Sequence, residues 1–202
     1  MHNIPVAFII IVVVALFFKT FMNRSMKNYN PNEEFWEKEK KADRTPRKPV
    51  DDLPYITVDK DSLPLDIPCR KAEAEELQDN IRMLSEKKIL NFTGISNTDL
   101  KLTYGAPNIA FLTACDLNYT RLVQNVAKLA ELYIKEGYTA EAKTLLEYGI
   151  SVGTDVKKNY TLLAKIYVED GQKEKIPEMI ETAKTLNSLS KNGIIAHLEK
   201  MM

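Results

Sequence analysis

One pattern of large, small and turn-forming residues occurs twice in this chain, offset by 34 residues. Glycine follows the first half of each copy, so each copy predicts two helices joined by a turn. Such a helical pair cannot bury its apolar face alone, so the recurrence predicts pairs that stack side by side. The first copy consists of Val126, Leu129, Ala130, Tyr133, Gly137, Ala142, Leu146 and Gly149. The second consists of Tyr160, Leu163, Ala164, Tyr167, Gly171, Ile176, Ile180 and Ala183.

A further helix is predicted ahead of the repeats, over about residues 70–88. Its apolar residues recur at spacings of three and four and form one stripe, which consists of Ala74, Leu77, Ile81 and Leu84. Residues 109–115 form an apolar run that is too short to assign to a helix or a strand. Because this run is so apolar, we expect it to be buried between the first helix and the repeats.

Capping residues and glycines set the expected bounds of the repeats. Asp116 or Asn118 can begin the first repeat helix, which is expected to end at Gly137. Ile176 replaces the small residue expected where two paired helices cross, so we expect the second pair to splay slightly. A short helix over about residues 193–200 is expected to cap the stack. The helical domain therefore spans residues 69–202, with repeats over about 123–156 and 157–190 and a capping segment over 191–202.

The first 27 residues are expected to anchor the chain in a membrane. No charged residue occurs from residue 4 to residue 18, and the apolar run continues past Lys19 to residue 22. Nineteen residues at about 1.5 Å each span roughly 28 Å, close to the thickness of the hydrocarbon core. A cleaved secretion signal would need basic residues before the run and small residues after it, and this run has neither.

Basic residues predict the orientation of this single span. Lys19, Arg24 and several more lysines follow the apolar run, and none precedes it. Because Lys and Arg accumulate on the cytoplasmic side, we expect the N-terminus outside and the rest of the chain in the cytoplasm. Lys19 and Arg24 are then expected at the membrane interface, where long basic side chains reach the headgroups.

Residues 28–68 are predicted to form a charged, proline-rich linker. Pairs of acidic and basic residues four apart allow a short helix over residues 33–44. Phe35 and Trp36 would lie on that helix, either inserted at the membrane interface or carried on a solvated spacer. Residues 50–67 alternate prolines with apolar residues, which favours an extended strip. That strip either packs along the helical domain or forms a docking segment for another protein.

Composition and cysteine content exclude several functional classes. Lys and Arg number 28, as do Asp and Glu, so the chain lacks the basic excess of a nucleic-acid protein. Cys69 and Cys115 lie far apart; a disulfide is possible, but two free thiols in a reducing compartment is the simpler interpretation. With no phosphate-binding loop, catalytic triad or metal-ligand pattern in the sequence, we expect no enzymatic activity, cofactor, metal or small-molecule substrate.

The repeat residues resemble the tetratricopeptide repeat family. The likeness rests on the period, on Tyr133 and Tyr167, and on the two glycines that follow them. The first large position lacks the family's tryptophan, and no proline closes the repeat. The wider layout, including Phe35-Trp36 and the segments 51–55 and 98–105, is similar to membrane-anchored repeat proteins of bacteria. The resemblance implies an all-α chain with an N-terminal transmembrane helix, an extended linker and a C-terminal α-solenoid of antiparallel helical hairpins.

In this family, partners usually bind in a concave groove lined by the first helix of each hairpin. The corresponding positions here are Gln124, Lys128, Glu131 and Lys135 in the first repeat, and Lys158, Leu162, Lys165 and Glu169 in the second. The lysines Lys128, Lys158 and Lys165 could bind a carboxylate or an acidic peptide tail. Alternatively, they form the solvated face that any surface helix shows.

Two functions fit these expectations. The first is a membrane-tethered adaptor that binds a cytoplasmic protein through a short groove. The alternative is a structural subunit of a membrane complex, or a homo-oligomer, that packs through its helical faces without binding a peptide.

Overall fold

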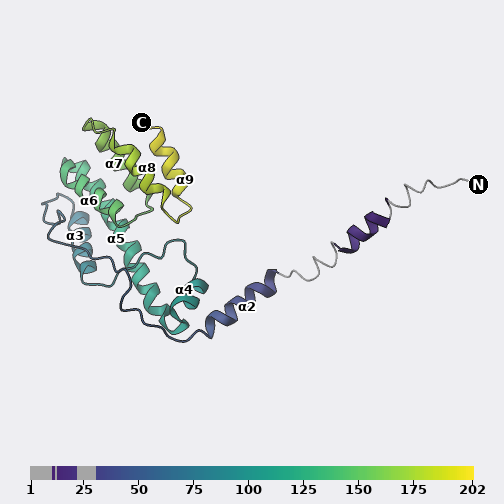
Figure 1. Cartoon of the computed structure of the whole chain (residues 1–202). Coiled ribbons are helices and arrows are strands. Elements are labelled where there is room, and N and C mark those ends of the chain that lie inside the picture. The colour runs from purple at the N-terminus through teal and green to yellow at the C-terminus, as the bar shows by residue number, and fades with distance from the viewer. Residues whose placement is uncertain (1–10, 12, 22–30) are drawn as a thin grey trace, which may run out of the picture.

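The computed structural model describes residues 11, 13–21 and 31–202, and every regular element in these ranges is helical (Figure 1). This confirms the all-α class. The elements from residue 31 onward are α2 (Pro31–Asp43), α3 (Ala72–Ser85), α4 (Asn97–Tyr104), the 3-10 turn η1 (Ala106–Asn108), α5 (Ile109–Glu136), α6 (Thr139–Ser151), α7 (Lys157–Glu169), α8 (Lys175–Lys184) and α9 (Lys191–Glu199).

The predicted membrane span, residues 4–22, lies partly outside the described residues. Residues 13–21 belong to a helix whose side chains are exposed. Over the described residues, the structure contains no helix with both the length and the hydropathy needed to cross a bilayer. Lys19 is an exposed residue of this helix, whereas Arg24 is outside the described residues.

The 34-residue recurrence corresponds to two successive helical pairs, α5–α6 and α7–α8. Gly137 at φ 91° and Gly171 at φ 72° follow the first helix of each pair, in a left-handed conformation that suits glycine. Leu129 and Leu163, 34 residues apart, are both buried in the main core. Residues at equivalent positions of the pattern therefore occupy equivalent environments.

The second pair is looser than the first. α6 packs on both α5 and α7, whereas α8 makes more of its contacts with α9 than with α7. This agrees with the expectation that Ile176, which is fully buried at the start of α8, holds the second pair apart. α9 packs on α7 and α8 and buries Ile194 and Leu198, so it closes the stack as expected.

The long helix α5 begins earlier than predicted. It starts at Ile109, directly after η1, and neither Asp116 nor Asn118 caps it. Instead, the Asp116 carboxylate accepts a hydrogen bond from the Phe92 amide, and the Asn118 amide donates to the Lys88 carbonyl. Residues 109–115 form its first turns. They pack in a second core with Leu90, Phe92 and Leu100, not between the first helix and the repeats.

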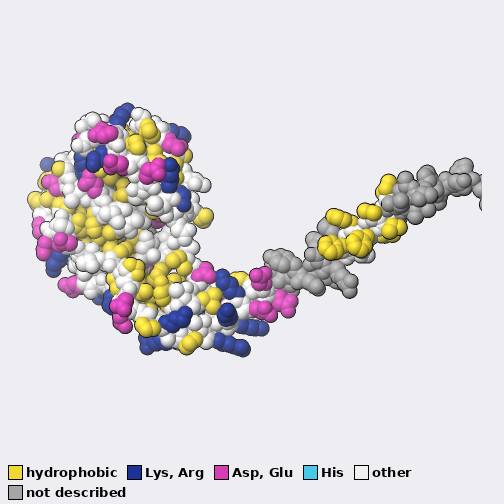
Figure 2. Space-filling view, in the orientation of Figure 1, with side chains coloured by type: hydrophobic (Ala, Val, Ile, Leu, Met, Phe, Trp, Pro, Cys, Tyr) yellow, Lys and Arg dark blue, Asp and Glu magenta, His cyan; other side chains and the backbone are white. Residues whose placement is uncertain are grey.

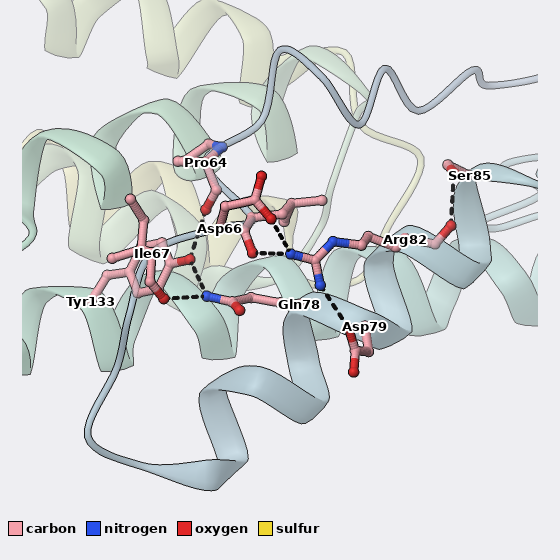
Figure 3. Close-up of polar contacts among 9 residues, drawn as sticks. Pro64, Asp66, Ile67, Gln78, Asp79, Arg82, Ser85 and Tyr133 are labelled. Atoms are coloured by element: carbon pink, nitrogen blue, oxygen red, sulfur yellow. Dashed lines mark hydrogen bonds and ion pairs between the residues drawn. The ribbon is translucent and has the colours of Figure 1, made fainter.

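The apolar strip, residues 50–67, packs along the helical domain. This confirms the first of the two expectations for this segment. Its residues Val58, Leu63 and Leu65 are buried in the main core. Its end is fixed by polar contacts with α3 and α5 (Figure 3). Arg82 donates to the Leu65 carbonyl and to Asp66, while Gln78 donates to the Ile67 carbonyl and to the Tyr133 hydroxyl. The Tyr133 hydroxyl itself donates to the Pro64 carbonyl at 2.6 Å.

The predicted linker contains a helix that is fixed to the body. α2 packs on α4, and Ala42 near its C-terminal end is fully buried. Residues 45–49 then run beside η1, where the fully buried Asn108 donates to the Lys48 and Tyr104 carbonyls. The region between α2 and α3 is therefore ordered against the helices by backbone hydrogen bonds and by the strip's buried side chains.

Candidate functional site

The predicted groove residues lie on the exposed faces of α5 and α7. Six of the eight side chains are exposed, whereas Glu131 is half-buried and Leu162 is partly buried against the main core. The six are Gln124, Lys128, Lys135, Lys158, Lys165 and Glu169. One hydrogen bond connects the two helices on this face: Lys158 on α7 donates to Glu131 on α5 at 2.7 Å.

Glu131 is the centre of a three-residue ion-pair cluster. It also accepts a hydrogen bond from Lys135, one turn further along α5, at 2.9 Å. Lys158 first and Lys135 second hold the pKa of the Glu131 carboxyl below its usual value. Lys158 is thus already paired with Glu131, although this single carboxylate is shared with Lys135, so Lys158 is a poorer candidate for binding an external carboxylate. Among the described residues, Lys128 and Lys165 form no ion pair and remain available.

A groove between α3 and α5 adjoins the same face of α5. It has a volume of about 410 Å³. The residues on its α5 side occur at spacings of three and four, and Lys128 continues the series, so the groove and the predicted site share one helix face. The groove is lined by Asn80, Met83 and Leu84 from α3, by Lys87 just after α3, and by Asn118, Arg121 and Asn125 from α5.

The 34-residue recurrence gives Asn125 a counterpart with a different role. Asn159 on α7 is fully buried and donates from its side-chain amide to the Leu146 carbonyl of α6 at 2.8 Å. Asn125 occupies the same position on α5, but its side chain faces the α3–α5 groove and makes no hydrogen bond with any described residue. An unpaired amide at a groove wall can donate to and accept from a peptide backbone.

The charge of the groove is positive. Lys87 and Arg121 line it, Lys128 lies one turn beyond, and no ion pair in the described part of the chain compensates any of the three. Met83 adds an exposed, flexible apolar side chain, 58% exposed. Cations, side-chain amides and an adaptable apolar residue together suit an extended acidic segment of another protein.

Two larger hollows have less chemical character. One of about 530 Å³ lies between the strip, the loop after α3 and the end of α6, and no charged side chain lines it. The other, about 620 Å³, lies beside the loop between α8 and α9; its Asp155 accepts a hydrogen bond from Ser188. Neither concentrates charge of one sign, so the α3–α5 groove is the stronger candidate for recognition.

The described residues give little support for metal binding or for a reactive thiol. No three His, Cys, Asp or Glu side chains there lie close enough together to hold an ion. Cys69 and Cys115 are unpaired, in agreement with the free-thiol interpretation. Burial raises the pKa of both thiols, which lowers the fraction of reactive thiolate.

Sequence reasoning missed the α3 side of the groove and the three residues on its α5 side, Asn118, Arg121 and Asn125. The available signal was the polar series formed by Asn118, Arg121, Asn125 and Lys128, which extends the predicted face by two turns. Asn80 and Met83 also share one face of α3, and Lys87 follows just after the helix, but the sequence does not indicate that these residues meet α5.

The chain has no match among known protein families, curated proteins or solved structures.

Proposed function

We propose that this protein is a membrane-tethered docking module of the tetratricopeptide type, which binds an acidic, extended segment of a protein partner in the α3–α5 groove. The observation that carries the proposal is the unpaired Asn125 among uncompensated cations, at a position where the next repeat pairs its asparagine internally. The proposed tether is the apolar N-terminal segment, with the N-terminus outside and the docking module in the cytoplasm.

The groove would bind an acidic segment by two kinds of contact. Arg121, Lys128 and Lys87 would pair with its carboxylates, and the Asn125 and Asn80 amides would hydrogen-bond to its backbone. Each charge-assisted hydrogen bond at a partly exposed site contributes on the order of 1 kcal/mol. The groove is short, so the expected affinity is modest and depends on salt.

A peptide titration of the full chain in detergent tests this proposal. The probe is a fluorescent peptide of alternating Glu and Leu with a free carboxylate, and the control probe replaces each Glu by Lys. We expect only the acidic probe to bind. The paired variant Arg121→Glu with Lys128→Glu should weaken binding by at least about tenfold, which corresponds to about 1.4 kcal/mol.

The matched control reverses two exposed lysines on other surfaces, Lys60→Glu with Lys173→Glu. Lys158 is unsuitable for the test, because its reversal would also break the ion pair with Glu131. Equal weakening by the control pair, or binding unaffected by the groove pair, would refute the groove assignment. Light scattering on the same samples tests the homo-oligomer form of the alternative, which requires a tight oligomer of the purified chain.

A further inference from the structure

α2 carries an aromatic pair of which both members are more than half exposed. Phe35 is 53% exposed and Trp36 is 61% exposed. Their ring centroids lie 5.4 Å apart in an edge-on arrangement. Phe35 shares a helix face with the buried Ala42, which lies two turns further on. The face of α2 that packs on α4 therefore continues, past the end of that contact, into two exposed aromatic rings.

α2 is held on α4 by ion pairs and a hydrogen bond. Lys101 on α4 pairs with Asp43 at 2.6 Å and with Glu39 at 3.3 Å. Lys38 pairs with Asp99 at 2.8 Å, and the Thr98 hydroxyl donates to Glu39. Three residues of one face of α2 are thus bound to α4, and this face surrounds the buried Ala42. The position of the aromatic pair is consequently set by the body of the protein.

The apolar helix upstream of α2 is connected to these rings by a short stretch of chain. The helical residues 13–21 expose a nearly continuous set of large apolar side chains (yellow in Figure 2): Val13, Val14, Leu16, Phe17, Phe18 and Phe21. Nine residues, 22–30, connect this helix to α2. Fully extended, they reach at most about 36 Å. Phe35 and Trp36 lie four and five residues after the start of α2, about 6–8 Å further along the helix. Any bilayer that takes up residues 13–21 thus comes within about 45 Å of them.

The exposed charges of α2 balance. In Figure 2 acidic and basic side chains both cover this part of the surface. Apart from the residues paired with α4, α2 and the residue directly after it expose three acids and three bases; they are Glu33, Glu34, Glu37, Lys40, Lys41 and Arg44. A contact with lipid would then depend on the aromatic rings, which favour the boundary between headgroups and hydrocarbon, more than on lipid charge.

We propose that Phe35 and Trp36 insert into the lipid–water interface of the bilayer that holds the N-terminal segment. Because α2 is fixed to α4, this second contact sets the orientation of the α3–α5 groove relative to the membrane surface. The inference rests on the proposed membrane tether. It adds a second surface that contacts the membrane, the lipid interface as its ligand, and a fixed orientation of the groove.

Trp36 is the single tryptophan of the chain and so reports on its own environment. The full chain is reconstituted in phosphatidylcholine vesicles, some of which carry nitroxide quenchers at shallow acyl positions. We expect the chain to float with the vesicles, the Trp36 emission to shift to shorter wavelength, and the shallow quencher to remove most of it. Adding phosphatidylserine should change the quenching little.

Two variants test the apolar contact. Phe35→Ser should reduce the quenching, because the apolar area beside Trp36 is lost. Leu189→Ser, a change at an exposed apolar residue of the loop between α8 and α9, should leave the quenching unchanged. A chain that floats with the vesicles while Trp36 stays unquenched would overturn this inference and leave the tether standing. A chain that does not float at all would overturn the tether itself.

A third variant tests the rigid attachment of α2. Lys101→Ala removes the ion pairs with Glu39 and Asp43, so trypsin should cleave after Arg44 and Arg47 faster than in the unmodified chain. Lys60→Ala removes an exposed lysine elsewhere and should leave the cleavage rate unchanged. Equal rates for Lys101→Ala and Lys60→Ala would overturn the fixed orientation.

Discussion

Lys158 on α7 donates a hydrogen bond to Glu131 on α5 at 2.7 Å and so joins the first helices of two successive helical pairs. Glu131 accepts a second hydrogen bond from Lys135 on its own helix. All three side chains were predicted to line a binding groove. Their mutual pairing gives them a structural role and leaves recognition to the neighbouring α3–α5 groove.

Glu131→Gln should destabilise the protein by about 0.5–1 kcal/mol at neutral pH, because two partly exposed ion pairs are lost. The folded-state pKa of Glu131 lies below the ordinary value of 4.5, so its stabilising contribution is complete above that pH and decreases as the pH falls further. Denaturant unfolding of both proteins at neutral and acidic pH measures this. A difference that stays constant, or grows, on acidification would contradict the assignment.

Tyr133→Phe should cost about 1–3 kcal/mol of unfolding free energy. The change removes the hydroxyl that donates to the Pro64 carbonyl and accepts from Gln78, both in a buried setting. Tyr148→Phe is the matched control, because the Tyr148 hydroxyl is buried without a hydrogen-bond partner among the described residues. Its removal should be neutral or slightly stabilising. Equal costs for the two changes, measured by urea unfolding, would show that the strip is not fixed through Tyr133.

Two glycine substitutions should have opposite signs. A Cβ atom added at Gly149 would lie 2.5 Å from the buried Asn159 Oδ1, so Gly149→Ala should destabilise by about 1–3 kcal/mol. A Cβ added at Gly193, within α9, meets no atom within 4 Å. Gly193→Ala should therefore stabilise by about 0.5–1 kcal/mol through helix propensity. Thermal unfolding measures both; a stabilising Gly149→Ala would contradict the close packing of α6 on α7.

Alkaline pH should lower the free energy of unfolding before the chain unfolds. Burial raises the pKa of Tyr133, Tyr148 and Tyr160 to about 12, above the ordinary value of 10. The folded state therefore holds these protons more tightly than the unfolded chain does. This contribution is complete below pH 10 and is lost as the pH rises to about 12. Unfolding free energy measured across that range should fall, together with the appearance of tyrosinate absorbance; a flat profile would contradict it.

The helical pairs could be predicted because each copy of the pattern carries its own turn signal. Gly137 and Gly171 end their helices locally, and the apolar spacing of α5 and α7 identifies the buried face without knowledge of the neighbour. The start of α5 at Ile109 could not be predicted in this way. Asp116 has the side chain of a typical helix cap. Its carboxylate instead accepts a hydrogen bond from the Phe92 amide, 24 residues earlier in the chain.

Prediction of the α3–α5 groove required knowledge of the neighbouring helix α3 as well as of α5 itself. The apolar stripe of α3 indicates which side of the helix is buried, but not that Met83 and Lys87 lie beside Arg121. The role of the strip was similarly open, because prolines and apolar residues suit both self-packing, which was the favoured expectation, and partner binding. Tertiary hydrogen bonds from Arg82 and Gln78 decide between the two.

Photo-crosslinking in the native membrane is the most direct test of the proposed docking function. A photoreactive amino acid replaces Asn125 in the α3–α5 groove, and in a second protein it replaces the exposed Glu181 on α8. We predict that the probe at residue 125 crosslinks a protein through an acidic segment, and that Arg121→Glu with Lys128→Glu abolishes this crosslink, while the probe at residue 181 does not capture that protein. Equal crosslinking at both positions, or a crosslink at residue 125 that survives the charge reversal, would contradict it.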